Sequence, residues 1–104
     1  MMHFINKFYR SKEDITFLEA NKIMKSNIVT LLDVRSPQEY NEGHIINSVN
    51  IPVYELINRA KFELNDKERI IIAYCSAGKR SRRAVKILKA LGYKNVYHIQ
   101  EGIK

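Results

Sequence analysis

The sequence has no tryptophan and only one cysteine, Cys75. A lone cysteine excludes a disulfide within the chain and suits a reducing compartment, so we expect a cytoplasmic protein. No apolar run approaches the length of a membrane span, and the N-terminus lacks the apolar core of a secretory signal. We therefore expect no association with a membrane.

Negative charge is also scarce, because 11 acidic residues stand against 18 lysines and arginines, a net charge of +7. Such a balance fits nucleic-acid binding and equally the attraction of small anions. No basic patch interleaved with aromatic residues occurs, so we regard nucleic acid as an unlikely partner. His3 and His98 have no companions at the spacing of metal ligands. We expect neither a metal nor a cofactor.

The length of 104 residues is near the commonest domain size, so we expect a single domain over residues 1–104. Strand and helix signals alternate, which favours an α/β fold with a mostly parallel central sheet. The expected strands are an edge strand near Phe4–Arg10 and further strands at residues 28–34, 48–51, 70–74 and 96–99. The expected helices cover residues 16–26, 36–43, 52–60 and 79–91.

Two of these helices begin with the spacing of a capping box, in which a hydroxyl residue precedes a glutamate by three positions. The pairs are Thr16 with Glu19 and Ser36 with Glu39. In the helix that begins at Thr16, we expect Leu18 to face the core together with residues 23 and 24.

The stretch Ile70–Ser81 is the part of the sequence on which a functional prediction depends. Its apolar run predicts a buried strand that delivers Cys75 to the carboxyl edge of the sheet, where open α/β folds bind ligands. Gly78 permits a tight loop, and positive charge gathers between Lys79 and Arg83 at the start of the next helix. Because a helix N-terminus attracts anions, the pattern predicts a site for the Cys75 thiolate, for a bound oxyanion, or for both.

We therefore select Cys75 as a candidate nucleophile. Cations and helix N-termini lower a thiol pKa from ~8.5 to ~3.5–7.5, which produces thiolate at neutral pH. The alternative is an inert buried cysteine beside a solvated basic helix face. The residues expected to bind the anion are Ser76, Ala77, Gly78, Lys79, Arg80 and Ser81.

Two sets of residues together resemble the rhodanese-like domains. Leu32–Arg35, Glu39-Tyr40, Gly43–Ile45 and Asn50–Pro52 are similar to the first signature of that family, and Tyr74–Ser81 is similar to its active-site loop. The resemblance implies a rhodanese-like five-stranded sheet flanked by helices on both faces. It also implies sulfurtransferase chemistry, in which Cys75 takes the outer sulfur of a donor such as thiosulfate. The resulting persulfide passes that sulfur to an external thiol, a protein or cyanide.

The same resemblance suggests supporting residues outside the loop. We expect Arg35 to pair with a carboxylate that fixes strand against helix, and Asp33 to brace the loop. Glu39 and His44 match signature positions, and we assign them structural roles. Ser76 stands where some thiosulfate-using relatives have arginine, so the identity of the donor stays open.

Two other functions stay open. Cysteine phosphatases and arsenate reductases also hold an oxyanion above a thiolate, but their arginine stands six positions after the cysteine, where this chain has Ser81. A sulfur carrier or partner-binding module is the second alternative, although the presence of Cys75, Gly78 and Arg80 argues against an inactive pocket. In every case the absence of a second cysteine requires that the sulfur acceptor come from outside the chain.

Overall fold

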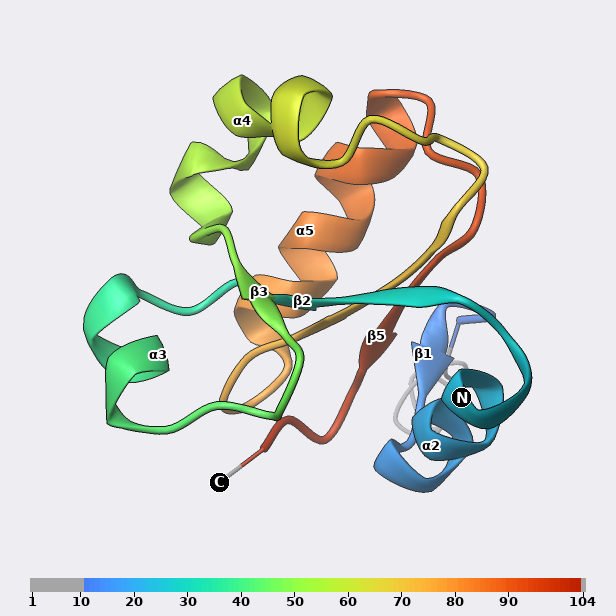
Figure 1. Cartoon of the computed structure of the whole chain (residues 1–104), viewed down its shortest axis with the longest axis vertical. Helices are drawn as coiled ribbons and strands as arrows, with labels where there is room; N and C mark the ends of the chain where they lie inside the picture. Colours follow the sequence, from blue (N-terminus) through green and yellow to red (C-terminus); the bar gives the residue numbers. More distant parts are fainter. Residues whose placement is uncertain (1–10, 104) are drawn as a thin grey trace, which may run out of the picture.

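The computed structural model describes residues 11–103, and in this range five strands form one sheet. The strand order is β1-β5-β4-β2-β3, and every neighbouring pair is parallel (Figure 1). The strands are β1 (Asp14–Ile15), β2 (Val29–Asp33), β3 (Val49–Asn50), β4 (Ile70–Tyr74) and β5 (Val96–Ile99). The predicted α/β class with a central parallel sheet is confirmed.

Helices cover both faces of this sheet. They are α2 (Phe17–Ser26), α3 (Pro37–Glu42), α4 (Leu56–Glu63) and α5 (Lys79–Ala90), and a short 3-10 turn, η1 (Val53–Glu55), leads into α4. Figure 1 shows α4 and α5 on one side of the sheet and α2 on the other. In the part of the chain that the structure describes, no helix has the length and apolarity needed to cross a membrane.

The position of β4 at the centre of the sheet explains why its sequence is apolar throughout. Ile71 and Ala73 are buried in the cluster beneath α4 and α5, while Ile72 and Tyr74 are buried in the cluster that packs against α2. A strand covered on both faces has no polar side, so it shows no alternation. This strand carries Cys75 into the same cluster as Ile71 and Ala73.

The core-facing side of α2 differs from the prediction at one residue. Ala20 is fully buried, and Ile23 and Met24 pack against the same cluster, as expected from a spacing of three and four residues. Leu18 is 65% exposed, so the expectation that it faces the core is wrong. Two positions before Ala20, it projects from the opposite side of the helix.

The edge of the sheet beside β5 is formed by β1, which the sequence analysis did not predict. The edge strand expected near Phe4–Arg10 lies outside the described residues. Asp14 pairs in register with His98, and Ile15 pairs with Ile99. A strand of two residues is too short to show a pattern of alternation.

Candidate active site

The loop after β4 surrounds the sulfur of Cys75 with hydrogen-bond donors. The backbone N–H of Gly78 lies 3.1 Å from Sγ, and that of Ser81 lies 3.3 Å from it. The hydroxyl oxygen of Ser81 is 3.5 Å from the same sulfur. Cys75 is 1% exposed and also belongs to the apolar cluster beneath α5. The sulfur is therefore apolar-packed on one side and hydrogen-bonded on the other.

Two glycines allow this loop to fold where it does. Gly78 has a φ of +91°, immediately before α5, and a Cβ there would collide with the carbonyl oxygen of Gln100. Gly102 has a φ of +73°, and a Cβ there would collide with the carbonyl oxygen of Ser76. The segment after β5 therefore packs directly on the loop, which a larger residue at either position would prevent.

The electrostatic surroundings of Cys75 favour its thiolate. Burial raises the pKa of the thiol, but hydrogen bonds from the Ser81 hydroxyl and from the N–H groups of Ser81, Ala77 and Gly78 outweigh it. The net effect is a pKa below the ordinary value for cysteine. The loop therefore stabilises a negative charge on the sulfur.

Arg80 points toward α3 and is held there by Glu39. Its guanidinium donates to both carboxylate oxygens of Glu39, at 2.7 and 3.0 Å, and to the Ser76 hydroxyl at 3.0 Å. The Arg80 hydrogen bond is the main cause that lowers the pKa of Glu39 to about 2. Lys79 is exposed on the first turn of α5. Of the two cations expected to meet an anion, Arg80 is thus already paired with a carboxylate.

Asp33 and Arg35 pair with each other at the carboxyl end of β2. The guanidinium of Arg35 contacts both carboxylate oxygens of Asp33, the shortest contact being 2.7 Å. The same group donates to the carbonyl oxygen of Gly43 at 2.7 Å, which ties the strand to the end of α3. Asp33 therefore holds the guanidinium of Arg35 at the carboxyl end of β2. His44 stacks on Tyr40 with ring centroids 3.7 Å apart.

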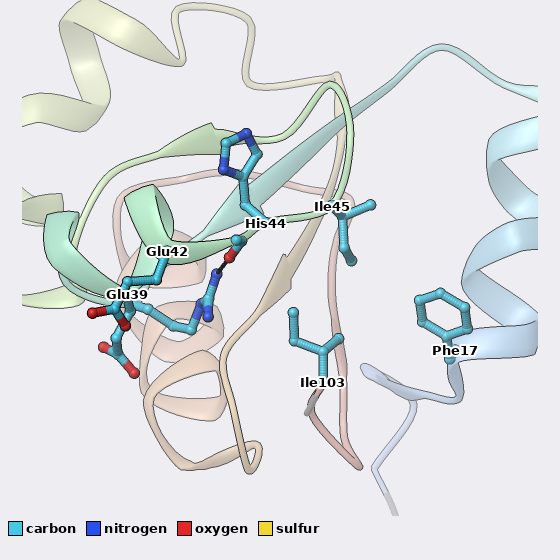
Figure 2. Close-up of a pocket in the computed structure, with 8 residues that line it drawn as sticks. Phe17, Glu39, Glu42, His44, Ile45 and Ile103 are labelled. Carbon is cyan, nitrogen blue, oxygen red and sulfur yellow. Dashed lines mark hydrogen bonds between the residues drawn. The ribbon is translucent and has the colours of Figure 1, made fainter.

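A cavity of about 580 Å³ opens beside this loop. Figure 2 shows Glu39 and Glu42 at one end of it and Phe17 at the other, with Ile45 and Ile103 between. Its lining residues are Phe17, Arg35, Glu39, Glu42, Gly43, His44, Ile45 and Ile103. The cavity adjoins the loop through Glu39, which binds Arg80, and Ile103, whose N–H donates to the carbonyl oxygen of Cys75.

Two buried residues near the sulfur were missed by the sequence analysis. His98 was considered only as a metal ligand, and Asp14 was not considered. In the structure the two are hydrogen-bonded, and His98 also contacts Ser81. A polar residue within the apolar strand 96–99 was the only available signal for His98. Within residues 11–103 no group of three or more His, Cys, Asp or Glu side chains could hold a metal ion.

The chain is similar to several known proteins. Residues 16–104 match the model of a family described as rhodanese-like domain. A tRNA uridine(34) hydroxylase of Buchnera aphidicola is 36% identical over 95 residues, which cover 85% of this chain and 30% of the hydroxylase. The thiosulfate sulfurtransferase PspE of Escherichia coli is 37% identical over 65 residues, which cover 62% of each protein. The chain thus spans less than two thirds of either curated relative.

A solved structure also matches the chain over most of its length. The human single-domain sulfurtransferase TSTD1 matches with a TM-score of 0.76 and 26% identity, over 90% of this chain and 93% of that one. The fold expected from the sequence, a parallel five-stranded sheet with helices on both faces, is therefore shared with these proteins.

Proposed function

The chain belongs to the rhodanese-like domain family, and on that premise we propose that it is a sulfurtransferase that carries sulfur as a persulfide on Cys75. The thiolate attacks the outer sulfur of a donor such as thiosulfate. A new S–S bond forms on Sγ, the S–S bond of the donor breaks, and sulfite leaves with the electron pair of that bond. Covalent catalysis of this kind divides one difficult transfer into two easier steps.

The observation that carries the proposal is the pair of backbone N–H groups aimed at Sγ from Gly78 and Ser81. Backbone amides fixed in position stabilise negative charge without having to reorient during the reaction. We infer that the amides of Ser76 and Ala77 complete the same cradle around the outer sulfur. They would hold the terminal charge of the persulfide.

The cations of the loop have different roles in this proposal. Lys79 is exposed and supplies the charge that attracts an anionic donor. Arg80 fixes the loop against α3 through Glu39 and Ser76. Asp33 and Arg35 hold the end of β2 in place beside the loop.

The second half of the cycle needs an external acceptor, because the chain has no second cysteine. A thiol or a protein thiolate attacks the outer sulfur, and the Cys75 thiolate is released. A free thiol persists in a reducing compartment, so we place this activity in the cytoplasm.

Intact-mass measurement after incubation with thiosulfate tests the proposal. We expect the wild-type protein to gain the mass of one sulfur atom, and a Cys75→Ala variant to gain nothing. Addition of cyanide or a small thiol should remove the added mass. A wild-type protein that gains no sulfur, or a variant that gains as much, would contradict the proposal.

A phosphatase activity is disfavoured by the side chains at the end of the loop. Ser81, at the sixth position after the cysteine, donates its N–H to Sγ and places its hydroxyl oxygen 3.5 Å from it. Arg80 donates to both carboxylate oxygens of Glu39, so its guanidinium is already paired with an anion of the chain itself. Steady turnover of p-nitrophenyl phosphate would overturn this conclusion.

The choice between an enzyme and a carrier depends on turnover. The Buchnera relative is a longer protein, a tRNA uridine(34) hydroxylase, so a domain of this kind also occurs as part of a larger protein. An enzyme produces many equivalents of thiocyanate from thiosulfate and cyanide, whereas a carrier loaded by another protein produces about one. Steady-state assay of the purified chain distinguishes the two.

A further inference from the structure

Four buried side chains form a continuous hydrogen-bonded row that ends at the proposed nucleophile. Cys75 Sγ lies 3.5 Å from Ser81 Oγ, which lies 2.7 Å from His98 Nδ1. The other ring nitrogen of His98, Nε2, lies 2.8 Å from Asp14 Oδ1. Their exposed fractions are 1% for Cys75, 0% for Ser81, 1% for His98 and 4% for Asp14. Water therefore does not interrupt this row.

The row is assembled by the sheet and by α5. The parallel register of β1 and β5 places Asp14 directly beside His98. Ser81 lies on the first turn of α5, and Cys75 directly follows β4. The row thus joins β1, β5, α5 and the loop after β4 in the buried interior.

The ionisation of Asp14 fixes the proton positions at one end of the row. Burial raises the pKa of Asp14, but hydrogen bonds from the Ser11 N–H and from His98, with the charge of Arg82, outweigh it and lower the pKa. An ionised carboxylate can only accept, so Nε2 of His98 carries a proton. In the neutral ring, Nδ1 then carries no proton and accepts a hydrogen bond from the Ser81 hydroxyl.

The single proton of the Ser81 hydroxyl links Cys75 to His98. Its possible acceptors are His98 Nδ1 at 2.7 Å, the Gly78 carbonyl oxygen at 3.2 Å and Sγ at 3.5 Å. When His98 is neutral, its Nδ1 accepts the hydrogen bond of the Ser81 hydroxyl. The lone pairs of Ser81 Oγ then accept a hydrogen bond from the S–H of a thiol. A thiolate instead needs the hydroxyl proton, which would leave Nδ1 buried without a partner unless Nδ1 is itself protonated. A thiol beside a neutral ring and a thiolate beside a charged ring are therefore both fully hydrogen-bonded, whereas a thiolate beside a neutral ring is not.

We propose that His98 and Asp14 are positioning residues that control the ionisation of Cys75 through the Ser81 hydroxyl, an inference that rests on the proposed role of Cys75 as nucleophile. In the step, the S–H bond of Cys75 breaks as its proton moves to Ser81 Oγ. The original hydroxyl proton of Ser81 moves to His98 Nδ1. No oxidant or reductant takes part, and the imidazolium is balanced by the Asp14 carboxylate.

Burial keeps the ring of His98 neutral at rest. Burial lowers the pKa of His98, and the positive charge of Arg82 on α5 lowers it too, while Asp14 and Glu13 raise it; the net pKa lies below the ordinary value. Lys86 and Lys89 of α5 line a cavity of about 250 Å³ shared with His98, Asp14 and Arg82. The ring is therefore neutral before the thiolate forms, which leaves Nδ1 as a hydrogen-bond acceptor for the Ser81 hydroxyl.

The first test titrates the Cys75 thiolate by its ultraviolet absorbance, with Cys75→Ala as the blank. A His98→Asn variant keeps hydrogen-bonding groups but cannot take up a proton. We expect His98→Asn and Ser81→Ala to raise the thiol pKa by about one unit, about a tenfold loss of thiolate at neutral pH. His44→Asn, which alters an exposed histidine outside the row, is the matched control and should titrate as the wild type does. A wild-type titration curve in His98→Asn overturns the proposal.

A second measurement leaves His98 untouched, in case its replacement prevents folding. The pKa and tautomer of the His98 ring are followed by nitrogen NMR in the wild type and in Cys75→Ala. Because coupling between two sites is reciprocal, loss of the thiolate should lower the pKa of His98. Equal values in the two proteins would sink the inference.

Neither measurement uses a sulfur donor, so the two proposals fail separately. If Cys75 and His98 titrate together but the protein gains no sulfur from thiosulfate, the sulfurtransferase proposal is rejected and the coupling between the two residues stands. If the protein gains sulfur but the two residues titrate independently, the coupling is rejected and the sulfurtransferase proposal stands. If both hold, sulfur transfer by His98→Asn should slow about tenfold at neutral pH and recover as the pH rises, which a merely structural role would not produce.

Discussion

At the scale of the residue, the conformation of Gly78 decides where the amides around Cys75 point. Its φ of +91° turns the chain from the loop into α5 and brings two N–H groups onto Sγ. The carbonyl of Gln100 packs where a side chain would begin. Backbone strain and steric contact therefore both require glycine at this position.

The first prediction follows from that position. Gly78→Ala should lower the free energy of unfolding by about 1–3 kcal/mol from backbone strain alone, and should raise the pKa of Cys75 because the amides shift. Urea denaturation and thiolate titration measure the two effects. Gly43→Ala is the matched control, because Gly43 has a φ of +156° but nothing within 4 Å of an added Cβ, and should lose less stability. Equal losses in the two variants would contradict the steric explanation.

At the scale of the element, α3 is connected to the site through one glutamate. Glu39 accepts from the Ser36 N–H at 3.0 Å and so completes the capping box at the start of α3. The same carboxylate binds Arg80 on the first turn of α5, with both side chains about one third exposed. The N-terminus of α3 is thereby fixed against the loop that holds Cys75.

Replacement of Glu39 by glutamine separates these two roles. Glutamine at this position still completes a capping box, so Glu39→Gln removes the ion pair and keeps the cap. Because the pair is partly exposed, we expect a loss of about 0.2–1 kcal/mol in unfolding free energy. We also expect a lower KM for thiosulfate, since the charge of Arg80 is released.

Ser36→Ala supplies the complementary control for that variant. It removes the cap and should lower the free energy of unfolding by about 1 kcal/mol. The ion pair of Glu39 and Arg80 stays in place. Urea denaturation and steady-state kinetics are measured on both variants. A KM that falls in Ser36→Ala as much as in Glu39→Gln would show that Arg80 is not the cause.

At the scale of the whole molecule, paired ionisable groups link stability to pH. Glu39 has a folded pKa of about 2, against an ordinary value of 4.5, and the pKa values of Glu13, Asp14 and Glu63 are also lowered. Burial lowers the pKa of His98 as well. Below the ordinary values the unfolded chain therefore binds more protons than the folded one.

Acid should consequently destabilise the protein in two stages. The contribution of His98 is fully present above its ordinary pKa near 6.5 and is lost as pH falls through its lower folded value. The contribution of Glu39 is present above pH 4.5 and is lost as pH falls toward about 2. Thermal melting between neutral pH and about pH 3 should show a falling Tm, less steep in Glu39→Gln below pH 4.5. An unchanged Tm in the wild type would refute this account.

Local sequence was sufficient for the elements that carry the nucleophile. The apolar run of β4, the glycine of the loop and the periodicity of α5 lie within residues 70–90, so their structure follows from neighbours in the chain. Both capping boxes form as predicted, because each depends on residues three positions apart. The prediction was weakest at β1, where two residues carry no pattern.

The amino-acid sequence by itself thus determined the strand, the loop and the helix around Cys75, because their contacts span only a few residues. Only the tertiary structure decided what those residues meet. Arg80 binds Glu39, 41 positions away, and His98 binds Asp14, 84 positions away. Such pairs depend on the register of parallel strands and on the packing of helices against the sheet, and no local pattern in the chain specifies either.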